Sequence, residues 1–146
     1  MPDILNDETE IFEQVEDVQQ NALALPDSAL PDRLYIIPIS NKPYFPAQVQ
    51  PIIVDEDPWL TTIERVSKTH HKCIALCWAP EPADHLLVAD RFARMGCVVR
   101  IHNVVRGEGK IQFIAQGIRR VWIHQWLHRQ PPLLAGVTYP SPRQED

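Results

Sequence analysis

The side chains best suited to chemistry in this sequence are the histidines and cysteines near position 71. His70, His71 and Cys73 lie close together, and Cys77 follows four residues later. Zinc prefers such imidazole and thiolate ligands. On a strand, however, Cys73 and Cys77 would stand about 13 Å apart at a rise of about 3.3 Å per residue, whereas a zinc–sulfur bond is about 2.3 Å long. His71 and Cys73 could converge only with a ligand from elsewhere, so we expect buried thiols and no metal.

A second group of reactive types is the run of carboxylates Asp55, Glu56 and Asp57. Paired carboxylates can act as general acid and base. This run lies where a strand gives way to a helix, with Asp57 as the expected N-cap and Pro58 at the first helical position. Capping and the helix dipole account for the three acids. The sequence also has no Gly-rich phosphate loop, Gly-x-Ser-x-Gly elbow or His-Glu-x-x-His pair, so we expect no catalytic residues.

A basic face is the remaining chemical candidate. Arg100, His102, Lys110 and Arg120 could line one side of a sheet with Trp122 among them. Cations interleaved with an aromatic residue suit nucleic-acid backbones and bases. The alternative is an ordinary solvated sheet face. The cations are few and the acidic N-terminal arm would repel phosphate, which argues against nucleic acid.

These residues must be positioned by short strands rather than by long helices. The 146 residues include 14 prolines and only 5 glycines, which favours strands with stiff connections. Between Met95 and Ile123, alternating apolar residues predict three antiparallel strands joined by two turns marked by glycine. We expect further strands and one helix between them over residues 34–39, 49–54, 57–69 (the helix), 71–78 and 133–139. The predicted fold is mainly β with one or two helices, as an irregular barrel of about six short strands.

Charge divides the chain into two parts. Residues 1–32 carry nine carboxylates and no Lys or Arg, whereas the remainder has fourteen basic and ten acidic residues. Ile11, Val15 and Val18, with Phe12 nearby, form a weak helical pattern in the acidic part, which could dock locally or on a partner. We expect residues 1–32 to form a mobile arm that folding does not need. Three cysteines, no signal peptide and no 18-residue apolar run indicate a reducing cytoplasm.

The body of the chain resembles the N-terminal domain of Lon, the ATP-dependent protease. The resemblance lies in the order IPISNKPYFPAQVQPIIV, a helix, ALCWAPEP and FARMGCVVRIHNVVRGEGKIQFIAQGIRRVWI, and it covers about residues 34–140. Ser40-Asn41-Lys42, Pro51 and the long acidic leader depart from the family pattern and fit a divergent paralogue. The positions that match the family are Pro38, Ile39, Pro46, Gly96, Gly117, Arg119 and Arg120.

The resemblance implies a PUA-like pseudo-barrel over residues 33–140, with residues 141–146 starting a linker. It implies a domain that recruits unfolded or tagged protein substrates in protein quality control. In Lon this domain precedes an AAA+ ATPase, which uses ATP and Mg, and a Ser-Lys protease in a homohexamer. None of that machinery is present here, so we expect a fragment of a larger hydrolase that needs no cofactor itself. A stand-alone PUA-like module that binds RNA or a small ligand is the alternative.

Binding unfolded polypeptide requires exposed apolar surface, for which the sequence offers three candidates. Tyr44 and Phe45 lie in a loop bounded by prolines. The alternation along the strand places Trp122 on the same face as polar residues. The alternative is that all three belong to the core.

Overall fold

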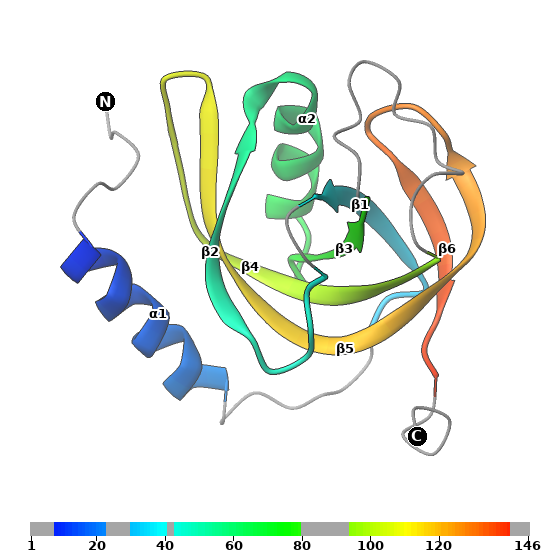
Figure 1. Ribbon diagram of the computed structural model, residues 1–146. Coiled ribbons are helices and arrows are strands. Elements are labelled where there is room, and N and C mark those ends of the chain that lie inside the picture. The colour runs from blue at the N-terminus through cyan, green and yellow to red at the C-terminus, as the bar shows by residue number, and fades with distance from the viewer. Residues whose placement is uncertain (1–7, 23–29, 41–42, 80–93, 141–146) are drawn as a thin grey trace.

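The computed structural model describes residues 8–22, 30–40, 43–79 and 94–140 (Figure 1). Two helices and six strands follow one another along the chain. They are α1 (Glu8–Ala22), β1 (Arg33–Ile39), β2 (Val49–Asp55), α2 (Glu56–Ser67), β3 (Cys73–Trp78), β4 (Met95–Gly107), β5 (Lys110–His128) and β6 (Leu134–Thr138). The mainly β class with two helices is confirmed. No helix in these ranges is long and apolar enough to cross a membrane.

The sheet closes on itself through β5. The strand order is β2-β5-β4-β3-β1-β6, and β6 pairs with β5 again. All pairs are antiparallel except β1 with β3. Since β5 has 19 residues, its first part pairs with β2 and its last part with β6, while β4 follows it from Lys110 to Trp122. The result is the predicted pseudo-barrel, with β2 as an edge strand outside the closed ring.

The region Met95–Ile123 holds two long strands where the alternation predicted three short ones. A tight turn at Glu108 and Gly109, both with positive φ, joins β4 to β5 as expected. Gly117 is not a turn but lies inside β5, where the carbonyl oxygen of Phe45 comes close. A Cβ at this position would stand 2.5 Å from that oxygen. The glycine is therefore explained by a close backbone approach rather than by chain reversal.

The core lies between the curved sheet and α2. Trp59, Thr62, Ile63 and Val66 form the buried side of this helix, and the helix lies inside the curve of the strands in Figure 1. The expected capping by Asp57 is wrong. Asp57 and Pro58 have non-helical backbone angles and are joined by a cis peptide bond, and Asp55, which precedes the helix, makes no side-chain capping hydrogen bond.

Each of the two prolines inside strands lies where its strand is paired with a neighbouring strand on one side only. Pro51 lies in the edge strand β2. Pro38 lies in β1, whose pairing with β6 covers only Arg33 to Tyr35, so at Pro38 only β3 is paired. The expectation of edges, bulges or ends for these prolines is confirmed.

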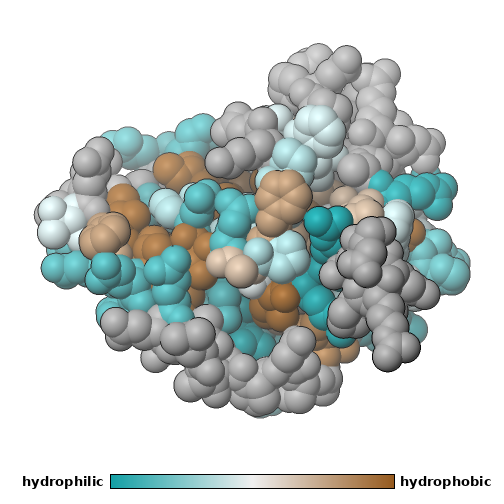
Figure 2. All heavy atoms as spheres, turned by 60° about the horizontal axis from the view of Figure 1, so that its bottom comes forward, coloured by the Kyte–Doolittle hydropathy of each residue, from teal (hydrophilic) through white to brown (hydrophobic). Residues whose placement is uncertain are grey.

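Part of the acidic arm forms the helix α1, which packs on β2 and β5. Val18 is buried against Val49 and Ile114, and Val15 packs beside them. Figure 2 shows apolar side chains at the side of the molecule that carries α1, bordered by hydrophilic ones. The weak helical pattern in the sequence thus marks a real helix. The expected mobility of residues 1–32 stays a prediction.

Candidate functional site

The segment before β2 presents one aromatic side chain to solvent from a firmly held backbone. The amide of Ala47 donates to the carbonyl of Gly117 at 3.1 Å, and the amide of Gly117 donates to the carbonyl of Gln48 at 2.7 Å. The amide of Phe45 donates to the side-chain Oε1 of Gln48 at 2.7 Å. Phe45 itself is 47% exposed. These bonds order the loop without burying the ring of Phe45.

Tyr44, the neighbour of Phe45, points the other way. It is 8% exposed, and its hydroxyl donates to the carbonyl of Ala115 at 2.7 Å. Burial is the main cause of its raised pKa. The expectation of exposed surface therefore holds for Phe45 but is wrong for Tyr44, which anchors the segment to β5.

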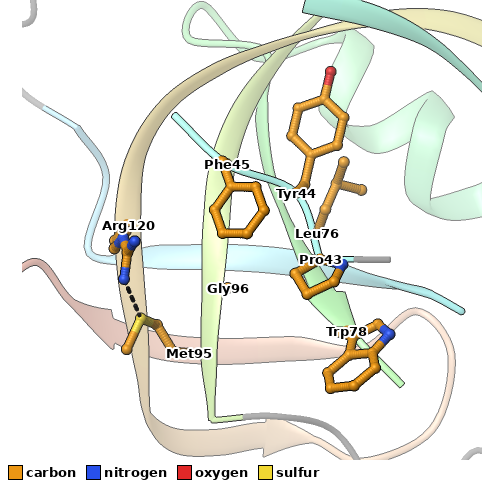
Figure 3. A pocket seen from close by; sticks show the side chains of 8 residues that line it. All are labelled: Pro43, Tyr44, Phe45, Leu76, Trp78, Met95, Gly96 and Arg120. Carbon is orange, nitrogen blue, oxygen red and sulfur yellow. Dashed lines mark hydrogen bonds between the residues drawn. The ribbon is translucent and has the colours of Figure 1, made fainter. Parts of the chain in front are cut away.

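A small pocket opens beside Phe45, on the face formed by β3, β4 and β5 (Figure 3). Its volume is about 70 Å³, which is about half that of an engineered cavity that accepts benzene. The pocket can hold a small aliphatic side chain but no nucleotide. Its walls are mostly apolar, with one cation, and consist of Pro43, Tyr44, Phe45, Leu76, Trp78, Met95, Gly96 and Arg120.

Met95 connects the pocket to the third predicted residue, Trp122. Met95 lines the pocket and pairs with Trp122 across the β4–β5 ladder. Directly paired residues of antiparallel strands point to the same face. Trp122 is 40% exposed, so apolar surface continues from the pocket onto β5. The sequence singled out Phe45 and Trp122 but missed Met95, Leu76 and Trp78, because only the strand register brings these to the same place.

The predicted basic face is divided between two faces of the sheet. Arg100 pairs with Gln116, whereas Arg120 pairs with Cys97. Arg100 and Cys97 are three residues apart on β4 and therefore point to opposite faces. The cause is a register shift between Val98 and Val99, where β5 carries an extra residue. A single basic face suited to nucleic acid is therefore wrong.

The other three residues of that prediction already have partners, and so does the nearby Arg106. Arg100 donates from Nε to the carbonyl of His71 at 3.1 Å, and the Nε2 of His102 lies 2.8 Å from the Oε1 of Gln116. Lys110 pairs with Asp55, and Arg106 pairs with Glu56 at 2.6 Å. Two of the three adjacent carboxylates therefore tie the start of α2 to the β4–β5 hairpin. This placement gives them a structural role. The side-chain capping that the sequence suggested is absent at Asp55, whereas Glu56 and Asp57 lie in the first turn of α2, as the helix-dipole interpretation expected.

The cysteines are buried, free thiols. Burial raises the pKa of Cys77 and of Cys97 to about 12, which keeps both protonated at neutral pH. The Nδ1 of His71 accepts a hydrogen bond from the amide of Cys73 at 2.9 Å. Within the described ranges, no three His, Cys, Asp or Glu side chains gather where they could hold a metal ion.

Comparison with known proteins identifies the family. Residues 33–146 match the model of the ATP-dependent protease La (LON) substrate-binding domain. Over 138 residues the chain is 33% identical to Lon protease 2 of Hydrogenovibrio crunogenus, which covers 94% of this chain and 15% of that protein. It is 29% identical to Lon protease of Magnetococcus marinus, over 92% of this chain and 18% of that protein. The chain thus spans less than a fifth of these relatives.

Solved structures show the same fold. The N-terminal domain of Lon protease from Mycobacterium avium complex superposes with a TM-score of 0.56 at 22% identity, over 75% of this chain and 55% of that one. The Lon N-terminal domain protein of Xanthomonas campestris gives 0.57 at 21%, over 78% of this chain and 63% of that one. With the family match over residues 33–146, these likenesses show that the chain belongs to the family of Lon substrate-binding domains.

Proposed function

We propose that this domain holds unfolded or tagged polypeptides on the apolar surface formed by Phe45, Met95 and Trp122. The observation that carries the proposal is the exposed ring of Phe45 on a backbone segment held by hydrogen bonds that involve Ala47, Gln48 and Gly117. A single exposed apolar ring is ordinary, but Phe45 adjoins the pocket and the apolar surface that continues from Met95 to Trp122. Contiguous exposed apolar surface is typical of interaction sites. Rigid support also lowers the entropy that binding must overcome.

In the longer protein that the relatives represent, this surface would pass substrates to the ATPase and the serine protease. That protein would use ATP and Mg, and it would assemble as a homohexamer in the cytoplasm. The three free cysteines fit such a reducing compartment. The chain itself contributes recognition.

The test compares two exposed phenylalanines in the 146-residue chain. We expect Phe45→Ser to weaken binding of casein, a natively unfolded protein, by about fivefold or more, because an aromatic anchor in an interface contributes about 1 kcal/mol or more. Phe12 on α1 is 61% exposed, and Phe12→Ser is the matched control that should leave casein affinity unchanged. Affinity is measured by fluorescence anisotropy with labelled casein.

Thermal unfolding separates binding from packing. Neither substitution should lower the midpoint appreciably, since both rings are exposed. If Phe45→Ser destabilises the chain and casein affinity of the folded fraction stays the same, Phe45 is a packing residue and the proposal is wrong.

A further inference from the structure

The pocket beside Phe45 contains a cation without an acidic partner. The Nη1 of Arg120 lies 3.6 Å from the Sδ of Met95, and a thioether is a weak acceptor. Across the described ranges, no carboxylate pairs with this guanidinium. The preceding residue differs: the Nη2 of Arg119 donates to the carbonyl of Pro140 at 2.9 Å, and its guanidinium lies 5.7 Å from the ring centre of Tyr139. Arg119 is therefore structural, whereas Arg120 keeps donors for a ligand.

The apolar part of the pocket limits what that ligand can carry. At about 70 Å³ the hollow has room for a side chain such as that of Ala or Val, but not for an aromatic ring. Pro43, Leu76 and Trp78 form its walls, and Figure 3 shows Arg120 and Met95 at the opposite side from Trp78. The lining and size of the hollow therefore favour a ligand that presents a small aliphatic group next to an anion.

We propose that this pocket binds the C-terminal residue of a polypeptide, with the terminal carboxylate on Arg120 and a small aliphatic side chain in the hollow. A C-terminal residue carries both groups on one Cα. An internal Asp or Glu carries a carboxylate in place of an apolar side chain, and its neighbours in an extended chain point to the opposite side. The guanidinium can hold a carboxylate by two parallel hydrogen bonds. The proposal rests on the proposed function, because it names the part of the substrate that this surface recognises.

The residues before the C-terminus would lie along the apolar surface that leaves the pocket. Met95 is part of the pocket wall, and its ladder partner Trp122 is exposed on the same face. This arrangement combines one specific contact at the chain end with contacts of low sequence selectivity behind it.

The test uses two peptides that differ only at the chain end. Both have the sequence Gly-Ser-Gly-Ser-Val, one with a free carboxylate and the other with a terminal amide, and binding to the 146-residue chain is followed by NMR titration. We expect the free acid to bind about tenfold more tightly, a difference of about 1.4 kcal/mol. Arg120→Gln should abolish this preference. Lys68→Gln, which removes an exposed cation at the end of α2, should preserve it.

Two further measurements keep the outcomes separate. Arg120→Lys retains the positive charge but lacks the planar guanidinium that makes two parallel hydrogen bonds. We therefore expect a smaller but measurable preference for the free acid. Equal affinity of acid and amide for the unmodified chain, or an unchanged ratio in Arg120→Gln, would overturn the proposal. Casein binding that depends on Phe45 would then still support the proposed function, whereas absent casein binding would refute that function by itself.

Discussion

At the scale of single residues, Tyr44 and Phe45 show how neighbours acquire different roles. The ring of Tyr44 is buried in the core, whereas the ring of its neighbour Phe45 faces solvent. The Tyr44 hydroxyl needs a partner because it is buried, and the carbonyl of Ala115 supplies it. The candidate surface therefore depends on a buried tyrosine that anchors the segment carrying Phe45.

Thr62 offers a test of the buried polar groups that lack such a partner. It is fully buried in α2, and in the described structure its Oγ1 makes no hydrogen bond. Thr62→Val keeps the shape and removes the hydroxyl, so the free energy of unfolding should rise by about 1 kcal/mol in urea denaturation. The adjacent exposed Thr61 is the matched control, and Thr61→Val should change stability by less than about 0.5 kcal/mol. A loss of stability in Thr62→Val would mean that the hydroxyl is satisfied in solution.

At the scale of elements, the site depends on how closely the segment before β2 approaches β5. Gly117 allows this approach, because a Cβ there would stand 2.5 Å from the carbonyl oxygen of Phe45 and 3.3 Å from that of Gln48. Backbone atoms cannot move aside as a flexible side chain can. The position of Phe45 is therefore coupled to the identity of one residue in the neighbouring strand.

Two glycine substitutions test this coupling. We expect Gly117→Ala to reduce the free energy of unfolding by about 2 kcal/mol or more, as overpacking in an interior does, and to weaken casein binding by displacing Phe45. A Cβ at Gly136 in β6 would have no neighbour closer than 3.8 Å, at the Gln125 carbonyl oxygen, so Gly136→Ala should be nearly neutral. Urea denaturation of both variants checks the prediction. Equal stability of the two variants would show that the segment before β2 can shift to accommodate a Cβ at position 117 at little cost.

At the scale of the whole molecule, the acidic helix α1 is an addition to a barrel that closes without it. The ring of strands runs through β5, β4, β3, β1 and β6 and does not involve α1. The helix contributes the burial of Val18 against Val49 and Ile114. Its described residues carry acidic side chains and no Lys or Arg, so repulsion between like charges opposes the helix when it is undocked.

A chain that begins at Ala29 measures how much this docking contributes. We expect the far-UV spectrum of the barrel and cooperative unfolding to persist, with a loss of about 1–3 kcal/mol, the value of burying one or two aliphatic side chains. The sequence predicts only that folding does not need residues 1–32, so a loss of this size would be the contribution of the docked helix. Val18→Ala in the full chain should reproduce part of the loss. Precipitation or non-cooperative unfolding of the shortened chain would show that α1 is integral to the fold.

The sequence by itself determined the class of fold and the family, and it singled out two aromatic residues that the structure exposes. Period-two alternation reports half-buried strands locally, and the combination of motifs over residues 34–140 identifies the family. The flanking prolines of Phe45 and the polar neighbours of Trp122 made these residues candidates for exposure, and the structure exposes both. The strand inference depends on a few residues that are adjacent in the chain, and the family inference depends on the order of several such motifs.

Only the tertiary structure decided which residues share a face and which strands close the barrel. The extra residue in β5 opposite Val98 and Val99 places Arg120 and Trp122 with Met95, and away from Arg100. Alternation cannot reveal such a shift, because a bulge changes the parity only relative to the partner strand. The length of β5, the burial of Tyr44 and the docking of α1 likewise depend on contacts between residues distant in sequence.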